Sequence, residues 1–300
     1  MRVLAIFGPT SVGKTGVAVA VAERLRERGE DPVAISCDAI QVYRGLEVLS
    51  GAARPDERER LEHRLLGIAD VGEEFSAGRF AELARAEIDE LLEARRRPIV
   101  VGGTGLYLRA ALSDLDLRPP VPEEVRRAVE EEIAAAGPEA LHAQLDPDLA
   151  AAIHPRDRKR IARTLELQRA GVEPPRPHER GGRLWTAELR HPTLLVGLTV
   201  DPKELAARID ARVDAMLAAG AAEEAAAADR VGASRTARAA IGFEELLAGD
   251  AEATKSAQRA FARRQLTWMR RMEGVETIDR SGLTDSEVAQ RIVELVDERR

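Results

Sequence analysis

Short apolar runs alternate with longer segments of helical periodicity along most of this chain. Runs typical of buried strands occur at residues 3–7, 32–36, 98–101 and 193–200, and a shorter one lies at 276–278. Each of the first four is followed by a segment in which apolar residues recur every three or four positions. Strands that alternate with helices predict an α/β fold built on a parallel sheet.

Several helices can be placed by their apolar stripes and end signals. One follows the first strand and ends at Gly29, a second begins at the N-cap Ser76, and a third runs from Asp201-Pro202 to Gly220. The second is predicted to bury Phe80, Leu83, Ala84, Ile88, Leu91 and Leu92, and the third Leu205, Ile209, Val213, Met216 and Leu217. An alanine-rich helix comes next, and a terminal helix closes the chain. Residues 46–70 are charged and are predicted to be irregular.

A last long helix is predicted over residues 255–273. Its expected apolar stripe is Phe261, Trp268 and Met272. Arginines surround that stripe at positions 259, 263, 264, 270 and 271.

Residues 117–122 are rich in proline, and the alternation of strands and helices stops there. Residues 123–170 carry no strand signal, and Val125, Ala128, Val129 and Ile133 fall on one helical face. Residues 172–183 are rich in proline and glycine and are predicted to form a loop. The predicted organisation is a P-loop-type α/β core at 1–119 and 191–300, with the P-loop itself at residues 8–15, interrupted by a helical insertion at 120–190.

Residues 8–15 match the phosphate-binding pattern G-x-x-x-x-G-K-[ST] in full. They lie between a predicted strand and a predicted helix, where backbone amides and the helix dipole hold phosphate. Lys14 is expected to reach the terminal phosphate, and Thr15 to bind a magnesium ion. The predicted diphosphate-binding residues are Gly8, Thr10, Ser11, Val12, Gly13, Lys14 and Thr15. The motif predicts the class of ligand and leaves the reaction open.

Two further polar residues follow predicted strands. Asp38 comes after the second strand, and Thr104 lies in the glycine turn 102–105 after the third. Ligands of open α/β sheets lie beyond the carboxyl ends of the strands, so both side chains are expected near the P-loop. The alternative for each is a local role, as a loop-capping aspartate and a turn threonine.

A cluster of cations is predicted in the insertion. A helix over residues 157–170 would place Arg156, Lys159, Arg160 and Arg163 at i, i+3, i+4 and i+7, on one face. Such a face suits an anionic partner, and the alternative is an ordinary solvated surface. The net charge of the 300-residue chain is −7, so any nucleic acid must be held by a local basic patch of this kind.

The composition also indicates the cellular compartment in which the protein is expected. Cys37 is the single cysteine, which excludes an intramolecular disulfide and fits a reducing compartment. No apolar run is long enough to span a membrane, and the N-terminus shows no signal-peptide pattern. A cytoplasmic, monomeric protein without a membrane partner is expected.

Taken together, the motifs resemble those of the bacterial tRNA dimethylallyltransferases, also called tRNA isopentenyltransferases. The resemblance covers nearly the full length. The glycine-threonine turn with its tyrosine and the C-terminal Arg-Gln-x-Thr-Trp run are its more specific parts. The matching segments are residues 8–15, Asp38 together with residues 41–45, and residues 63–66, 101–107, 160–166, 240–243 and 263–268.

The resemblance implies transfer of a dimethylallyl group from dimethylallyl diphosphate to the exocyclic amine of the adenosine 3′ of the anticodon. The tRNAs concerned read codons that begin with U, the product is isopentenyladenosine, and the base is extruded from the loop. By this analogy Asp38 is the general base and Thr104 lies near the bridging oxygen. Lys14, Thr15 and Arg212 neutralise the leaving group, and Thr15 and Asp38 hold Mg²⁺.

The resemblance also implies contacts with the anticodon stem-loop. The residues concerned are Asp38, Ala39, Ile40, Gln41, Thr104, Arg126, Lys159, Arg160, Arg163, Ala239, Gly242 and Phe243. The sequence departs from the family at two places. Family members usually have Asp-Ser-Arg-Gln where this chain has Asp38-Ala39-Ile40-Gln41, and residues 48–55 are longer than the usual Ile-Gly-Thr-Ala-Lys-Pro.

Two other functions account for part of this pattern. A P-loop kinase of nucleotides or small metabolites would explain the P-loop together with Arg208 and Arg212, and leaves the basic insertion face unexplained. An RNA-binding module without catalysis would explain that face, and leaves four residues unexplained: Lys14, Thr15, Asp38 and Thr104. A phosphoryl-transfer assay tests the first function, and a turnover assay on an anticodon stem-loop tests the second.

Overall fold

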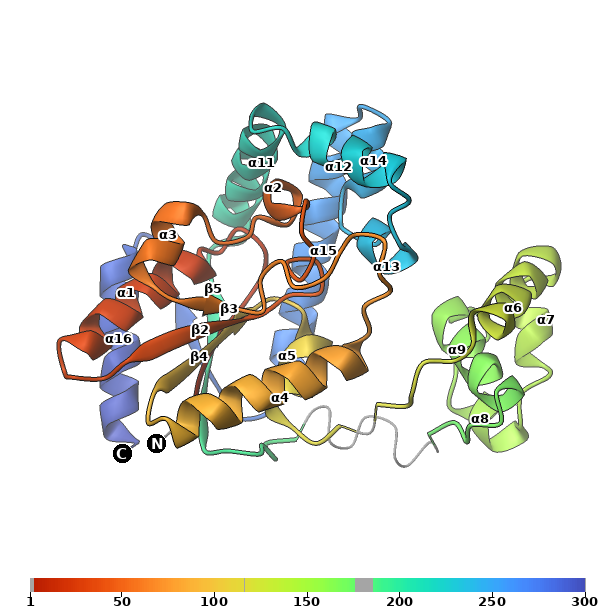
Figure 1. Ribbon diagram of the computed structural model, residues 1–300, viewed down its shortest axis with the longest axis horizontal. Helices are drawn as coiled ribbons and strands as arrows, with labels where there is room; N and C mark the ends of the chain where they lie inside the picture. Colours follow the sequence, from red (N-terminus) through yellow and green to blue (C-terminus); the bar gives the residue numbers. More distant parts are fainter. Residues whose placement is uncertain (1–2, 116, 176–185, 300) are drawn as a thin grey trace. The chain divides into compact units, whose positions relative to one another are not determined.

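A six-stranded, all-parallel sheet is the framework of the α/β part of the computed structural model (Figure 1), which describes residues 3–115, 117–175 and 186–299. The strand order is β3-β2-β4-β1-β5-β6. The strands are β1 Val3–Phe7, β2 Pro32–Cys37, β3 His63–Arg64, β4 Arg97–Gly102, β5 Thr193–Thr199 and β6 Val275–Asp279. The predicted P-loop-type α/β fold is thereby confirmed.

The register of the central strands brings their carboxyl ends to one edge. Phe7 at the end of β1 and Cys37 at the end of β2 both align with Gly102 at the end of β4. An added Cβ at Gly102 would lie 2.1 Å from the carbonyl oxygen of Cys37, so only glycine allows this approach. The segments that follow the three strands therefore begin beside one another.

Helices cover both faces of the sheet, as a parallel sheet requires. Helices α1 and α16 pack against each other and, with Leu4, Ile6 and Val196 of the sheet, form a large apolar cluster. Helices α4 and α5 pack on β2 and β4. The longer helices of the core are α1 Lys14–Arg26, α4 Ala77–Glu93, α11 Pro202–Ala218, α12 Ala221–Arg230, α15 Ala251–Arg271 and α16 Asp285–Glu298.

The helix starts predicted at Ser76 and Asp201 are confirmed, the long helix predicted from residue 255 begins at Ala251, and one segment predicted to be irregular is ordered. The Ser76 hydroxyl accepts from the amide of Arg79, and the Asp201 carboxylate caps the amides of Lys203 and Glu204. Leu83, which was expected in the buried stripe of α4, is exposed. Residues 46–70 contain the short helices α2 Glu47–Ser50 and α3 Pro55–Arg60 as well as β3. The remaining short helices of the core are α5 Gly105–Leu112, α13 Arg235–Arg238 and α14 Phe243–Leu247.

The apolar stripe predicted for α15 is only partly buried. Phe261 and Trp268 are half-buried, whereas Met272, just beyond the last turn, is buried. The buried face of the helix is instead Thr254, Gln258, Ala262, Gln265 and Met269. Its polar members can be buried because they have hydrogen-bond partners, such as the Ile241 carbonyl that accepts from Gln258 Nε2 at 3.0 Å.

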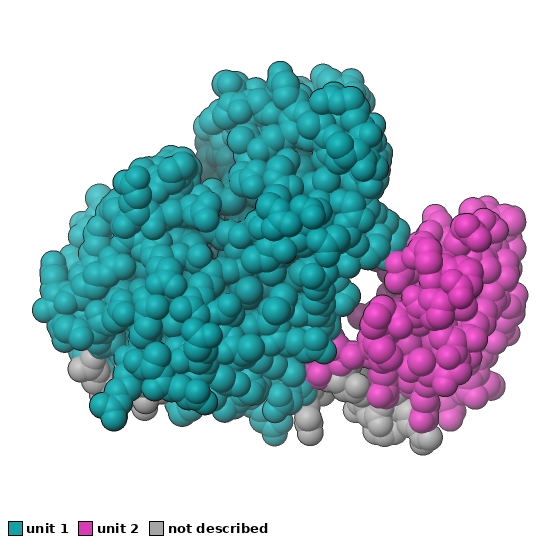
Figure 2. All heavy atoms as spheres, in the orientation of Figure 1, with its two compact units in different colours: residues 1–114, 187–300 teal, residues 115–186 magenta. Residues whose placement is uncertain are grey.

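The chain divides into two compact units (Figure 2), residues 1–114 with 187–300 and residues 115–186. The second unit contains α6 Glu123–Ala136, α7 Pro138–His142, α8 Pro147–Ala151 and α9 Arg158–Arg169. It has its own apolar core of Val129, Ile133, Leu141, Leu145, Ile153, Ile161 and Leu165. Val125 is half-buried and Ala128 is exposed, so the buried face of α6 is narrower than predicted. Most of the loop predicted at 172–183 lies outside the described residues.

Among the helices that the structure describes, none has the length and apolarity that crossing a membrane would require.

Candidate active site

The P-loop connects β1 to α1 with a backbone that only certain residues adopt easily. Gly13, immediately before α1, has a φ of 88°, and Ser11 has a φ of 63° although it is not a glycine. The Ser11 hydroxyl is buried and has no hydrogen-bond partner among the described residues. A buried polar atom of this kind needs a partner, and a phosphate oxygen would supply one.

Lys14 folds back over the loop that precedes it. Its Nζ donates to the carbonyls of Gly8 at 3.1 Å and Pro9 at 2.8 Å. Burial and, to a smaller extent, the charge of Arg212 lower the pKa of Lys14 to about 8, while the charge of Asp38 acts in the opposite direction. The ammonium group is therefore held in a dehydrated site beside a second cation.

Arg212 reaches the P-loop from α11. Its Nη1 donates to the Thr10 hydroxyl at 2.9 Å and its Nη2 to the Ser50 carbonyl at 3.0 Å. Burial lowers the pKa of the Arg212 guanidinium, and the charge of Asp38 opposes that shift. Two desolvated cations thus face one carboxylate. The excess positive charge makes the site suitable for an anionic group such as a diphosphate.

Asp38 and Thr104 occupy the ends of neighbouring strands, as predicted. The Asp38 Oδ1 accepts from the amide of Ile40 at 2.9 Å, which fixes the carboxylate by a local turn. Thr104 begins α5, and its side chain makes no capping hydrogen bond. Burial and the charge of Asp38 raise the pKa of the Cys37 thiol well above its usual value, so this cysteine is a poor nucleophile.

Two residues that the sequence interpretation missed hold the P-loop from the C-terminal part of the chain. The side-chain amide of Gln265 in α15 contacts Thr10 and Gly103, and the guanidinium of Arg280 donates to the Val12 carbonyl at 2.8 Å. Gln265 lies within the Arg-Gln-x-Thr-Trp run, which was a usable signal. Arg280 follows β6 outside any motif.

Comparison with known proteins identifies the family. The sequence profile of the IPP transferases matches residues 41–272, well over half of the chain. The chain belongs to the IPP transferase family. A tRNA dimethylallyltransferase of Anaeromyxobacter sp. (strain Fw109-5) is 44% identical to it over 292 residues, which are 92% of this chain and 94% of the relative.

Other members of the family agree with this assignment. The tRNA dimethylallyltransferase of Thermobifida fusca is 40% identical over 90% of this chain and 87% of its own length. The crystal structure of the full-length tRNA isopentenylpyrophosphate transferase from Bacillus halodurans superposes with a TM-score of 0.71 at 31% identity. That comparison covers 99% of this chain and 96% of the other. The family resemblance seen in the sequence is confirmed.

The core residues that the IPP transferase resemblance assigns to tRNA differ in exposure. Ala39 and Ile40 are half-buried and Ala239 is exposed. The Gln41 amide is used inside the protein, where it accepts from the Ser36 hydroxyl at 2.8 Å and donates to the Gly51 carbonyl at 3.2 Å. Its availability to RNA therefore depends on breaking these two bonds.

Two of the assigned residues are buried in the protein. The ring of Phe243 is fully buried, which does not favour a direct side-chain contact with tRNA. The guanidinium of Arg238 lies 5.1 Å above that ring. Gly242 is also buried, with a φ of 99°, and forms the turn into α14.

The four-cation face predicted for the insertion is only partly formed. Arg156 precedes α9 and pairs with Glu139 at 3.3 Å, and Arg160 pairs with Asp157, the N-cap of its own helix, at 3.3 Å. Arg163 donates to the Pro119 carbonyl at 2.7 Å. Lys159 is exposed and has no ion pair among the described residues of the unit. These cations are thus partly neutralised within the insertion.

Arg126 lies in the same unit, on α6. It pairs with Glu123 at 3.1 Å.

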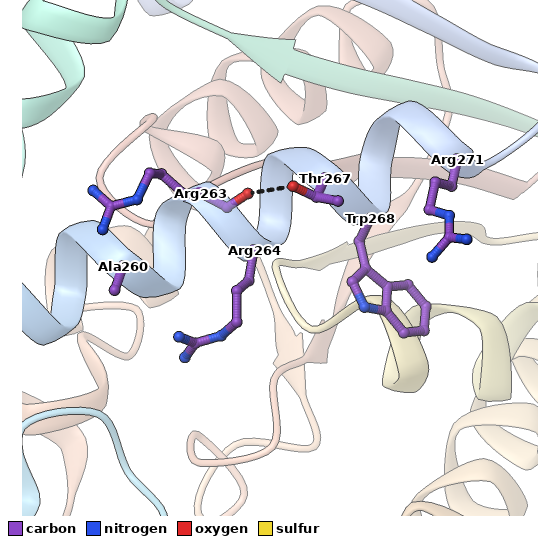
Figure 3. Close-up of a pocket in the computed structure, with 6 residues that line it drawn as sticks. All are labelled: Ala260, Arg263, Arg264, Thr267, Trp268 and Arg271. Atoms are coloured by element: carbon purple, nitrogen blue, oxygen red, sulfur yellow. Dashed lines mark hydrogen bonds between the residues drawn. The ribbon is translucent and has the colours of Figure 1, made fainter. Parts of the chain in front are cut away.

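Helix α15 carries a second basic surface on its outer side. A hollow of about 470 Å³ is lined by Ala260, Arg263, Arg264, Thr267, Trp268 and Arg271 (Figure 3). Arg264, Trp268 and Arg271 project to the same side of the helix in this view. The Trp268 ring also covers Gly105, where an added Cβ would lie 2.2 Å from its Cε3. Arginines beside an indole form a surface suited to phosphates and unstacked bases.

Proposed function

We propose that this protein transfers the dimethylallyl group of dimethylallyl diphosphate to the exocyclic amine of the adenosine 3′ of the anticodon. The tRNAs concerned read codons that begin with U, and the product is isopentenyladenosine. The observation that carries the proposal is the pair of desolvated cations, Lys14 and Arg212, at the P-loop beside the carboxylate of Asp38. Membership of the IPP transferase family supports a prenyl diphosphate as the ligand rather than a nucleoside triphosphate.

The leaving group is stabilised by the P-loop side of the site. As the bond between the allylic carbon and the bridging oxygen breaks, its electron pair passes to the diphosphate. Lys14 and Arg212 balance the growing charge, and the buried Ser11 hydroxyl can donate to a phosphate oxygen. Thr104 is assigned to the bridging oxygen because its hydroxyl is not used in capping α5.

Asp38 is assigned as the general base. The adenine amine is a weak nucleophile, because its lone pair is delocalised into the ring, and positive charge builds on nitrogen as the bond to carbon forms. A carboxylate in hydrogen-bond reach can take the proton during that step. The Ile40 amide fixes one oxygen of Asp38 and leaves Oδ2 as the proton acceptor.

Magnesium fits the donors that are present. The described residues contain no cluster of three or more His, Cys, Asp or Glu side chains that could hold a metal by themselves. Mg²⁺ is commonly held by one or two protein oxygens together with substrate phosphates and water. We assign the Thr15 hydroxyl and the Asp38 carboxylate to this ion, which would neutralise diphosphate charge when bound.

The tRNA is assigned to two basic surfaces, one in each unit. In the insertion, Arg126, Lys159, Arg160 and Arg163 are proposed to hold the backbone of the anticodon stem-loop. Lys159 is exposed without an ion pair in the described part of that unit. In the core, the α15 hollow is proposed to contact the loop nucleotides. Since tRNA is the proposed acceptor, we expect the protein to act in the cytoplasm, as a monomer.

The test is mass spectrometry of an unmodified anticodon stem-loop after incubation with enzyme, Mg²⁺ and dimethylallyl diphosphate. The expected result is addition of one dimethylallyl group at the adenosine 3′ of the anticodon. A matched stem-loop with guanosine at that position should gain nothing, because guanosine carries a carbonyl oxygen at C6, where adenosine carries its exocyclic amine. Absence of transfer, with steady hydrolysis of ATP in its place, would favour the kinase alternative.

A further inference from the structure

Gln265 makes two hydrogen bonds whose direction is fixed by chemistry. Its Oε1 accepts from the backbone amide of Thr10 at 2.8 Å, and its Nε2 donates to the carbonyl of Gly103 at 2.9 Å. A backbone N–H can only donate and a carbonyl can only accept, so the orientation of the side-chain amide is settled. The side chain is 7% exposed, so both bonds are shielded from water.

These bonds join the two loops that carry the reacting groups. Thr10 lies in the P-loop, where its hydroxyl accepts from Arg212 at 2.9 Å, and Gly103 immediately precedes Thr104. A peptide unit is planar, with its C=O and N–H pointing in opposite directions. Since the Gly103 carbonyl points at Gln265, the Thr104 amide must point away from α15.

Two glycines of the turn lie so close to α15 that a side chain at either position would collide with it. An added Cβ at Gly103 would lie 2.2 Å from Nε2 of Gln265 and 3.0 Å from the carbonyl oxygen of Gly8. One turn along the helix, Trp268 covers Gly105. Thr104 therefore lies between two positions that the same helix holds, and the P-loop approaches the first of them.

We propose that Gln265 is a positioning residue for the transfer: it sets the P-loop and the Thr104 turn in the register in which both can bind one diphosphate. The proposal rests on the proposed function for its ligand. Its geometry, however, can be tested with inorganic pyrophosphate, without tRNA or prenyl transfer.

Gln265→Glu separates a positioning role from a general packing role, because only the positioning role predicts a loss of pyrophosphate affinity that depends on pH. A protonated glutamic acid can still accept from Thr10 with one oxygen and donate to Gly103 with the other. The ionised form can only accept, and it would set a negative charge against the Gly103 carbonyl. Burial favours the protonated form, so the variant should work at low pH and fail as its carboxyl ionises.

Other groups near Gln265 also carry or change charge. Lys14, Arg212 and Asp38 lie at the P-loop, and Arg263 and Arg264 are neighbours of Gln265 on α15. The pKa of Lys14 is about 8, so it titrates in the range of the experiment. The result is therefore expressed as the ratio of variant to wild-type affinity at each pH, which removes contributions common to both proteins.

The experiment is calorimetric titration of inorganic pyrophosphate with Mg²⁺ from pH 5.5 to 8.5. We expect the affinity of Gln265→Glu, relative to wild type, to fall about tenfold or more across this range, about the effect of leaving one buried hydrogen-bonding group without its partner. Gln265→Leu should be weakened by a constant factor at every pH. A flat ratio for Gln265→Glu, or a wild-type affinity in Gln265→Leu, would overturn the proposal.

Gln258 supplies a matched control. It lies on the same buried face of α15, is also 7% exposed, and donates to the Ile241 carbonyl instead of the P-loop. Gln258→Glu should lose thermal stability as pH rises, much as Gln265→Glu does, and bind pyrophosphate like the wild type. Equal loss of pyrophosphate affinity in both variants would show that unfolding, not positioning, is measured, and would contradict the proposal.

Transfer assays separate this proposal from the proposed function. A wild-type protein that binds pyrophosphate without transferring a prenyl group contradicts only the proposed function. A wild-type transferase whose single-turnover rate is unchanged in Gln265→Leu contradicts only the positioning role.

Discussion

The guanidinium of Arg280 fills the space that a side chain at Gly13 would need. An added Cβ at Gly13 would lie 2.1 Å from Nη1 of Arg280, and the same nitrogen donates to the Val12 carbonyl at 2.8 Å. Nη2 of Arg280 pairs with Asp285, at the start of α16, at 2.8 Å. The C-terminal β6–α16 connection therefore supports the P-loop from the side of its carbonyls.

Replacing Arg280 with Met should destabilise the fold and weaken diphosphate binding. The change leaves the Val12 carbonyl without its donor, a loss of about 1.5–3 kcal/mol for a hydrogen bond to a charged group. Urea unfolding measures the free energy, and pyrophosphate calorimetry measures the site. Arg24→Met is the control, since Arg24 also bridges α1 to α16, through Gln290 and Ser286, with a partly exposed guanidinium. Equal losses in the two variants would contradict a special role for Arg280.

The affinity for diphosphate should fall as pH rises through about 8. The pKa of Lys14 is lowered to about 8 by burial and by Arg212, so the protein loses this cation above that pH. A bound anion favours the charged form, so binding above pH 8 should take up a proton. Pyrophosphate calorimetry from pH 7 to 9.5 in buffers of different ionisation enthalpy measures both quantities. In Lys14→Met, the change of affinity with pH reports the titration of pyrophosphate without that of Lys14. A wild-type affinity with the same pH dependence would contradict the assignment of Lys14 as the group that titrates.

The same shift has a consequence for stability, with a definite sign. The pKa of Lys14 is lower in the folded chain than the ordinary 10.5, so between about pH 8 and 10.5 the unfolded chain binds more protons. The Lys14 contribution to the free energy of unfolding should therefore rise with pH in that window. Urea unfolding of the wild type beside Lys14→Met isolates this contribution. A free energy of unfolding of the wild type that falls or stays constant relative to that of Lys14→Met, as pH rises through this window, would contradict the prediction.

Asp38→Asn should reduce turnover on the order of 10²–10⁴, the range of one general base. The amide keeps an oxygen that can accept from Ile40, so the turn should persist while the proton acceptor is lost. Binding of tRNA should change far less, because phosphate contacts dominate affinity. Single-turnover transfer to an anticodon stem-loop measures the effect. Asp70→Asn, at a carboxylate whose side chain is 70% exposed, is the control. A fall of less than about tenfold in Asp38→Asn would mean that another group takes the proton.

Lys159→Ala should weaken tRNA binding and reduce the slope of log K against log salt by about one unit. Lys159 is exposed without an ion pair in the described part of the insertion, so its charge is available to a phosphate. Arg169→Ala is the control, because Arg169 lies on the same helix and is held by Glu132 through two bonds of 2.7 Å. Pyrophosphate affinity should be unchanged in both. An unaltered salt slope in Lys159→Ala would mean that this face is only solvated.

Local signals account for most of what could be predicted. The apolar runs located five of the six strands, and Ser76 and Asp201 marked helix starts because capping is a property of adjacent residues. The strand β3 has only two residues, too few for any periodicity. The P-loop was readable for the same reason, since its spacing is contained in one turn.

The signals failed where burial depends on a distant partner. The cation spacing 156–163 predicted one basic helical face, but the Asp157 cap starts α9 after Arg156, and Arg163 turns to the Pro119 carbonyl. For α15, the prediction relied on apolar residues and therefore placed Phe261 and Trp268 in the stripe that faces the core. The helix instead buries Gln258 and Gln265, whose amides find backbone partners elsewhere in the chain.

The sequence by itself determined the family, the phosphate-binding loop and the parallel α/β order, because each is written in short-range spacing or in overall similarity. Tertiary structure decided what holds that loop. The bond between Gln265 and Thr10 joins residues 255 positions apart, and that between Arg280 and Val12 joins residues 268 apart. Such a bond forms wherever folding brings a donor and an acceptor to within about 3 Å of each other. A local sequence pattern does not contain the information on which distant residues will meet.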